Sequence, residues 1–184
     1  MLSLHNVSKS YEKRVLSSIS YEFPAHGLFR ITGKSGSGKT TLLRLIAGLD
    51  LPDSGTIIWT QKPKISMVFQ EPRLIPHMTL LENVLFVADK RDPQRAIELL
   101  TCLGLGDDKD KKPSMLSGGM KLRASIARAL YFDGNVFLLD EPTRELDEEN
   151  KENVISLIEH LSKKALVLCA THESAWHTGV EICL

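Results

Sequence analysis

The chain has 184 residues, with 23 lysines and arginines against 23 aspartates and glutamates, and its formal net charge is zero. This length suits one compact domain, and the balanced charge disfavours a nucleic-acid partner. No apolar run approaches the roughly 18 residues that a membrane span needs. Three cysteines, odd in number and far apart, indicate a reducing compartment rather than a disulfide framework: Cys102, Cys169 and Cys183. The composition therefore argues against secreted, membrane-spanning and strongly basic proteins.

Short strands and one helix are predicted in the first third of the chain. Apolar residues alternate at 2–4 and 19–23, which is typical of half-buried antiparallel strands. Residues 28–32 predict a further strand that runs into a glycine-rich stretch, and the helical pattern at 42–46 ends at Gly48. A glycine-rich stretch between a strand and a helix is the usual context of a phosphate-binding loop.

Capping residues and apolar runs predict the elements of the other two thirds. Thr79 and Glu82 have capping-box spacing, and Asp92-Pro93 supplies an N-cap and a first-turn proline. The predicted elements are strands at 56–59, 65–69, 136–139 and 166–170, helices at 93–104, 118–130 and 147–161, and a charged, solvated loop at 106–113. Apolar runs such as 136–139 mark strands that are buried on both faces, as in parallel sheets. Strand and helix alternate around a helical stretch, which indicates the α/β class.

The glycine-rich stretch fits a phosphate-binding loop. Its residues Gly33-Lys34-Ser35-Gly36-Ser37-Gly38-Lys39-Thr40 match the pattern G-x-x-x-x-G-K-[ST]. Glycines let successive backbone N–H groups turn inward around phosphates, and the N-terminus of the following helix adds its positive dipole end. Lys39 is expected to reach the β- and γ-phosphates, and Thr40 to place its hydroxyl on Mg²⁺. The context therefore favours nucleotide binding over a flexible glycine-serine turn.

Two acids follow the apolar strand at 136–139. The carboxylate of Asp140 is expected at the carboxyl end of the sheet beside the phosphates, where it can serve as the metal ligand. Glu141 is next and points elsewhere, which suits a base that activates water. Alone, the pair is also compatible with a helix-entry turn of solvated acids. Together with the glycine-rich loop, it favours a metal ligand and a base.

A second anion site is predicted far from the glycine-rich loop. In Leu116-Ser117-Gly118-Gly119-Met120, which we call the signature segment, a serine caps a helix whose two glycines expose backbone N–H groups. With this segment the chain resembles the ATP-binding subunit of ABC transporters over nearly its whole length, with every motif in the family's order. The resemblance implies one domain over 1–184. Its expected parts are a P-loop NTPase core with a mostly parallel sheet, an N-terminal antiparallel β subdomain and a helical insertion at about 71–117.

The resemblance implies a role for each motif. Tyr11 matches the aromatic residue that stacks on adenine, Gln70 the glutamine that senses Mg²⁺ and the attacking water, and His172 the histidine that contacts the γ-phosphate. The implied catalytic residues are Lys39, Gln70, Glu141 and His172, and the implied metal ligands are Thr40, Gln70 and Asp140. The implied ATP-binding residues are Tyr11, Gly33, Lys34, Ser35, Gly36, Ser37, Gly38, Lys39, Thr40, Thr41 and Asp147, with Ser117, Gly118 and Gly119 acting in trans. From pattern alone, Tyr11 also fits a strand-end tyrosine.

The sequence departs from the family pattern in three places. Met120 replaces the glutamine that usually ends the signature segment, which predicts weaker closure or slower turnover. Arg144-Glu145 replace small residues before Leu146-Asp147, which places larger, charged groups near the expected dimer seam. Only 12 residues follow His172, so the closing strands are expected to be short.

The resemblance implies an ATPase that powers solute transport across a membrane. The expected ligands are ATP and Mg²⁺. The expected partners are a second cassette, in a homodimer or pseudo-symmetric dimer, integral membrane permease subunits and, as a further candidate, a solute-binding protein. The chain itself is expected at the cytoplasmic face of the cell membrane, as a peripheral protein. Glu71-Pro72-Arg73-Leu74 look most like importer subunits of the nitrate, sulfonate and taurine type, and an exporter stays open. The alternatives are a soluble ABC-type ATPase without a link to transport and a weakly hydrolysing nucleotide-binding switch.

Overall fold

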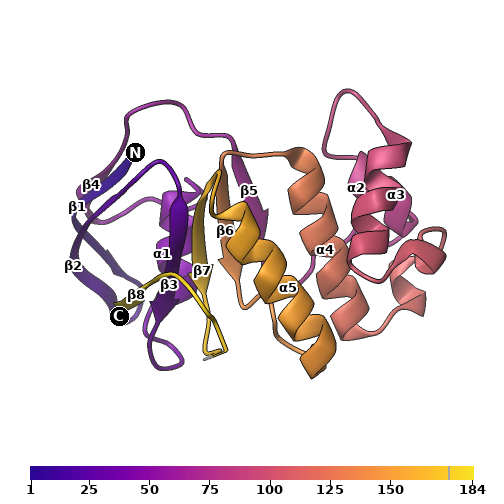
Figure 1. The fold of residues 1–184 in the computed structure, drawn as a ribbon. Helices are drawn as coiled ribbons and strands as arrows, with labels where there is room; N and C mark the ends of the chain where they lie inside the picture. Colours follow the sequence, from indigo (N-terminus) through magenta and orange to yellow (C-terminus); the bar gives the residue numbers. More distant parts are fainter. Residues whose placement is uncertain (174) are drawn as a thin grey trace.

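The N-terminal part of the fold is an antiparallel sheet. The computed structural model describes residues 1–173 and 175–184. The sheet has three strands in the order β2-β1-β4, with bounds β1 Leu2–Ser10, β2 Arg14–Phe23 and β4 Ser54–Trp59. Figure 1 shows it at one end of the molecule, beside both chain termini. Leu2 and Leu4 of β1 are buried and Ser3 between them is half-buried, which confirms the predicted period of two at 2–4. The alternation breaks before Val7, where the register shifts.

The central sheet is parallel and has five strands in the order β5-β6-β7-β3-β8. Their bounds are β3 Gly27–Thr32, β5 Ile65–Val68, β6 Val136–Asp140, β7 Leu166–Ala170 and β8 Val180–Cys183. Every residue of β6 and β7 is buried, as their continuous apolar runs predict. Short closing strands were expected after His172, without bounds, and β8 is a strand of four residues that pairs with β3. The two sheets and their helices confirm the α/β class.

Two helices lie against the central sheet. The helix α1, Lys39–Ile46, shares one apolar cluster with the buried residues of β1 and β2, so it joins the antiparallel sheet to the parallel one. The helix α5, Glu148–Leu161, belongs to a second cluster with β6 and β7. Figure 1 shows α5 running across the face of β6 and β7. Asp147 caps α5, since its Oδ1 accepts a hydrogen bond from the Asn150 N–H at 2.9 Å.

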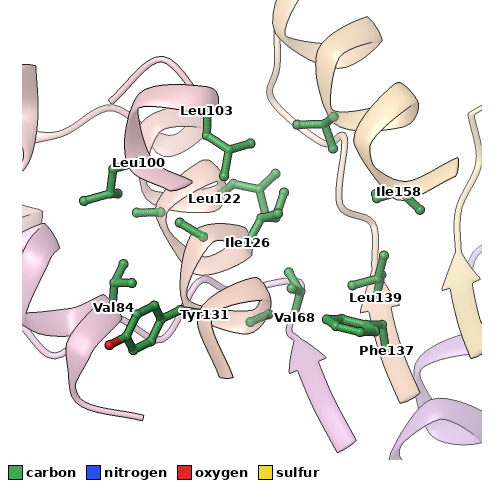
Figure 2. Close-up of a cluster of buried hydrophobic side chains, with 14 of the residues drawn as sticks. Val68, Val84, Leu100, Leu103, Leu122, Ile126, Tyr131, Phe137, Leu139 and Ile158 are labelled. Atoms are coloured by element: carbon green, nitrogen blue, oxygen red, sulfur yellow. The ribbon is translucent and has the colours of Figure 1, made fainter. Parts of the chain in front are cut away.

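The remaining helices form a layer at the other end of the molecule. They are α2 Leu80–Leu85, α3 Pro93–Cys102 and α4 Gly118–Phe132, with short 3₁₀ turns at Gly106–Asp108 and Pro113–Met115. In Figure 2, Leu122 and Ile126 of α4 lie between Leu100 of α3 on one side and Val68 of β5 on the other. The helix α4 therefore connects the helical layer to the sheet. Residues 71–117 remain our proposed bounds for the helical insertion.

The charged segment at 106–113 is a loop whose charged side chains are exposed or half-buried, as predicted. Its backbone carbonyls also cap α2: the Leu80 N–H donates to the oxygen of Lys111 at 3.0 Å, and the Leu81 N–H donates to that of Lys109 at 2.9 Å. The charge run indicated the solvated side chains and gave no information on these backbone bonds. In the described part of the chain, no helix combines the length and apolar character needed to cross a bilayer.

Candidate functional site

One cavity opens at the carboxyl ends of β6 and β7, beside the first turn of α1. Its volume is about 830 Å³, which is in the usual range for small-molecule sites. Most of the predicted site residues line it: Tyr11, Ser35, Gly36, Gly38, Lys39, Thr40, Thr41, Gln70, Asp140, Glu141 and His172. Segments far apart in the sequence therefore meet at the edge that α/β sheets use for ligands.

The glycine before α1 makes the loop fit against the antiparallel sheet. Gly38 has a φ of 100°, and a Cβ at this position would overlap the side chains of Leu16 and Val15. A residue with a side chain would therefore be strained in backbone and would clash with β2. The close approach places the N-terminal N–H groups of α1 at the wall of the cavity.

Lys39 is buried and is held by the loop that precedes it. Its Nζ donates to the carbonyl oxygens of Gly33 at 3.0 Å and Lys34 at 3.4 Å, and the same Lys34 oxygen accepts from the Ser37 N–H at 3.1 Å. Nζ also lies 2.9 Å from Nε2 of His172. Because an ammonium has only donor N–H groups, this imidazole nitrogen is the acceptor. A phosphate oxygen could replace any of these acceptors.

Asp140 is the buried acid of the cavity. It is 2% exposed, and its carboxylate accepts a hydrogen bond from the side chain of Thr40. Burial raises the pKa of Asp140, while the bond from Thr40 and the nearby charge of Lys39 oppose the rise. Gln70 follows β5 and lines the same cavity. The three side chains offer hydroxyl, carboxylate and amide oxygens, which are the hard ligands that Mg²⁺ prefers.

Glu141 faces a different partner from its neighbour. Its backbone is left-handed, with a φ of 51°, and its N–H donates to the Ala170 carbonyl at 2.9 Å. The Glu141 carboxylate lies 3.3 Å from the backbone nitrogen of His172, which donates to it, and 3.5 Å from Nε2 of the same residue. Asp140 contacts Thr40 and Glu141 contacts His172, so the two adjacent acids can do different chemistry.

Tyr11 forms an exposed aromatic wall of the cavity. Its side chain is 58% exposed, and its hydroxyl donates to Oδ2 of Asp50 at 3.3 Å. Arg44 also binds this carboxylate, at 2.7 Å, and lowers the pKa of Asp50. The ring is therefore anchored at its hydroxyl, and the Nζ of Lys9 lies 5.6 Å from its centroid. Its large exposed area leaves room for a planar base to stack on it.

The signature segment lies outside this cavity. Ser117 caps α4, with its Oγ accepting from the Met120 N–H at 3.2 Å, and among the described residues that line the cavity none comes from 116–120. Asp147 does not line it either. The structure therefore does not place Ser117, Gly118 and Gly119 on the wall of the cavity that holds Lys39.

The sequence analysis missed one wall of the cavity. It is formed by the turn after Glu141, whose lining residues are Thr143, Arg144, Glu145 and Leu146. Glu145 has a φ of 62°, and its carboxylate occupies the space that a Cβ on Gly118 would take. In the sequence, the only sign of this wall was that Arg144 and Glu145 replace the small residues of the family pattern. That replacement suggested charged groups near the dimer seam, and it did not predict the contact between Glu145 and Gly118.

Comparisons with known proteins agree with this geometry. A family model described as ABC transporter matches residues 16–144. The chain is 39% identical over 175 residues to an aliphatic sulfonates import ATP-binding protein of Mesorhizobium japonicum, with 89% of this chain covered. It is 38% identical over 179 residues to a lipoprotein-releasing system ATP-binding protein of Bacteroides thetaiotaomicron, with 85% of this chain and 82% of that protein covered.

A solved structure shares the fold. It is a dimeric ATP-binding cassette in a post-hydrolysis state bound to ADP and Pi, with a TM-score of 0.87 and 31% identity over 94% of this chain and 88% of that chain. This chain spans 66% of the sulfonate protein, 61% of a methionine import ATP-binding protein of Clostridioides difficile and 52% of a spermidine/putrescine import ATP-binding protein of Thermotoga maritima.

Proposed function

Because this chain belongs to the ABC transporter family, we propose that it is an ATP-binding and ATP-hydrolysing subunit that drives solute transport through partner membrane subunits. One observation carries the proposal. Lys39, Asp140, Glu141 and His172 converge on a single cavity at the first turn of α1, where His172 contacts both Lys39 and Glu141 while Asp140 is bonded by Thr40. That set supplies a phosphate-binding cation, a metal-binding acid, a base and a γ-phosphate contact.

The donor set near α1 fits Mg²⁺. Thr40, Gln70 and Asp140 would hold the ion through oxygen atoms, together with the nucleotide's phosphates and water. Among the described residues, no three histidines, cysteines or acids are grouped so that they could hold a metal ion by themselves. When bound, Mg²⁺ would neutralise charge on the β- and γ-phosphates.

In ATP hydrolysis, different residues of this chain would have different roles. The loop N–H groups and Lys39 bind the phosphates, and Tyr11 stacks on the adenine. Glu141 orients a water for in-line attack on the γ-phosphorus and takes up its proton. Lys39 and His172 stabilise the charge that develops on the γ-phosphate oxygens. In the resting geometry Lys39 donates to Nε2 of His172 at 2.9 Å, so a γ-phosphate oxygen would replace this acceptor on Lys39, and His172 would meet the phosphate through a ring N–H.

A second chain would complete each site. Ser117, Gly118 and Gly119 lie off the cavity of their own chain, and two backbone N–H groups at a helix start suit an anion. The similar solved cassettes are described as dimeric. We therefore place the γ-phosphate held by one chain against the signature segment of the other, with Asp147 beside the seam. Closure on ATP and opening after hydrolysis would be the power stroke.

The membrane partner would dock on the helical layer. Residues 71–117 carry α2 and α3 at the end of the molecule opposite the antiparallel sheet (Figure 1). The similar proteins include import subunits and macrolide export ATP-binding/permease proteins. We assign the chain to the cytoplasmic face of a membrane, with permease subunits as partners, and keep the sulfonate-type importer as the preferred subclass, with a solute-binding protein as a further partner.

Hydrolysis of Mg-ATP by the purified chain tests the proposal. We expect a rate per chain that rises with protein concentration, because each site needs two chains, and a loss of at least about a hundredfold in Glu141→Gln with ATP binding retained. An unchanged hydrolysis rate in Glu141→Gln would remove Glu141 from the mechanism. Absence of ATP binding by the wild-type chain would overturn the proposal as a whole.

A further inference from the structure

The loop that carries Gln70 is folded on itself. Gln70 follows β5, and the guanidinium of Arg73 lies 4.0 Å from the ring centroid of Phe69, the residue before Gln70. Arg73 has a φ of 46°, a left-handed conformation that costs about 1–2 kcal/mol for a residue with a side chain. Such a conformation persists only where the surroundings hold it.

A residue of α4 stabilises this left-handed conformation of Arg73. One guanidinium, that of Arg128, donates from Nη1 to the carbonyl oxygen of Arg73 at 2.9 Å and from Nη2 to that of Pro72 at 3.0 Å. Arg128 is half-buried, and within residues 1–173 and 175–184 no carboxylate forms an ion pair with it. Both of these guanidinium N–H groups therefore bind backbone carbonyl oxygens. Because the guanidinium is rigid, the two bonds fix the path of the backbone just after Gln70.

A second bond ties the same turn of α4 to β5. The hydroxyl of Ser66 donates to the carbonyl oxygen of Ala129 at 2.9 Å, and both residues are buried. Figure 2 shows the strand, labelled at Val68, beside the helix, labelled at Ile126. The segment from Ser66 to Arg73 is thus held at both ends by consecutive residues of one helix, and Gln70 lies in the middle of it.

We propose that Arg128 is the positioning residue of Gln70: its two bonds to the carbonyls of Pro72 and Arg73 hold the Gln70 side chain at the nucleotide cavity. Arg128 itself does not line that cavity in the described chain. The inference rests on the proposed function, because it assigns to Gln70 the contact with Mg²⁺ and the attacking water.

The arrangement also links the two ends of α4. The signature segment starts this helix and Arg128 lies ten residues beyond Gly118, at about 1.5 Å per residue, so roughly 15 Å separates them along one rigid element. A movement of α4 when the signature segment meets the partner chain's nucleotide therefore moves the Gln70 loop as well. Through Arg128, binding of the signature segment to the partner chain's nucleotide would thus change the position of Gln70 in the chain's own nucleotide cavity.

Arg128→Met and Arg128→Lys test the proposal. Methionine keeps the length of the side chain and removes both donors, whereas lysine keeps the charge and can reach one carbonyl at a time. We expect kcat to fall about ten- to a hundredfold in Arg128→Met and less in Arg128→Lys, because a small displacement of a positioning group has effects of this size. The Mg²⁺ concentration for half-maximal rate should rise, and the Kd for ATP should stay within about twofold of wild type, because the phosphate loop is untouched.

Arg123→Met is the matched control. Arg123 lies on the same helix and also donates to a backbone carbonyl, that of Leu103, at 2.6 Å, but this carbonyl belongs to the helical layer. We expect Arg123→Met to lower the melting temperature while the Mg²⁺ requirement stays at its wild-type value. An equal rise in the Mg²⁺ requirement in both variants would assign the effect of Arg128 to stability alone and overturn the proposal.

Hydrogen exchange separates this inference from the proposed function, because it needs no hydrolysis. In the nucleotide-free chain, amides of residues 69–74 should exchange at least about tenfold faster in Arg128→Met than in wild type, with those of α1 unchanged. Unchanged exchange at 69–74 would overturn the positioning role even in an active enzyme. Faster exchange at 69–74 in Arg128→Met, found together with a wild-type chain that hydrolyses no ATP, would retain the structural link and remove the proposed function.

Discussion

The carboxylate of Glu145 occupies the space beside Gly118 where a side chain on that glycine would begin. The contact crosses from the turn after the catalytic strand to the first turn of α4. Gly119 is equally close to this turn, since a Cβ on it would lie 2.8 Å from the carbonyl oxygen of Glu145. A negative charge therefore lies at the helix start that the proposed dimer uses for the partner chain's γ-phosphate.

Removing this charge should favour closure of the dimer. In Glu145→Gln the side chain keeps its size and loses its charge, and in Glu145→Ala it loses both. If the carboxylate opposes the γ-phosphate by about 1 kcal/mol, ATP hydrolysis at limiting protein concentration should rise roughly fivefold in both variants. A rise in Glu145→Ala alone would assign the effect to bulk. A rate that falls in both would show that Glu145 supports closure.

Substitutions at Ser117 should separate helix capping from nucleotide contact. Ser117→Ala removes the bond to the Met120 N–H, and loss of an N-cap costs about 1 kcal/mol, which corresponds to a drop of about 2–4 °C in Tm. Ser117→Asp keeps a cap and favours the helix dipole, so its Tm should equal or exceed that of wild type. It also places a carboxylate against the proposed γ-phosphate position, and its ATPase should be lost. Full ATPase activity in Ser117→Asp would rule out the signature segment as a phosphate contact.

Asp140→Asn should stabilise the nucleotide-free chain at neutral pH. Burial raises the pKa of Asp140, so the folded chain binds this proton more tightly than the unfolded chain does. The wild type therefore loses stability as the pH rises from about 3.9, the unfolded value, through the raised folded pKa. The Tm of Asp140→Asn should exceed that of wild type above this window and converge with it below. Mg-dependent hydrolysis should be lost. A Tm difference that does not change with pH would contradict this account of Asp140.

Tyr11 should contribute to binding through its ring face. Stacking of a base on an aromatic side chain is worth about 1–3 kcal/mol, so Tyr11→Ala should raise the Kd for ATP by about 5- to 150-fold. Tyr11→Phe loses only the bond to Asp50 and should stay within about threefold of wild type. Equilibrium titration with a fluorescent ATP analogue measures both. Equal affinity in Tyr11→Ala and wild type would place the base elsewhere.

Local signals account for what the sequence predicted well. Thr79 and Glu82 form both bonds of their capping box, at 3.2 and 2.7 Å, because the partners lie three residues apart and need no tertiary context. The buried strands at β6 and β7 were equally visible, since sheets covered on both faces need continuous apolar runs. Most of the cavity residues followed from their place after a strand or before a helix.

Tertiary relationships account for what the sequence did not show. The bonds from Arg128 to Arg73 and Pro72 join residues 55 and 56 positions apart, and no local pattern marks a backbone carbonyl as an acceptor. Short closing strands were expected after His172, but the bounds of β8 could not be predicted because most of its residues are exposed and it shows no strict alternation. The contact between Glu145 and Gly118 depends on how the turn after β6 packs on α4, which the residue types alone leave open.

Sedimentation of the Glu141→Gln chain with Mg-ATP tests the shared site most directly. Slow hydrolysis should trap ATP between two chains, so the account predicts a species of twice the chain mass of 20.5 kDa with Mg-ATP and single chains with Mg-ADP. Adding Ser117→Arg to the same chain should abolish the dimer and leave ATP bound. A Glu141→Gln chain that binds Mg-ATP and stays monomeric at all concentrations would contradict a nucleotide site built from two chains.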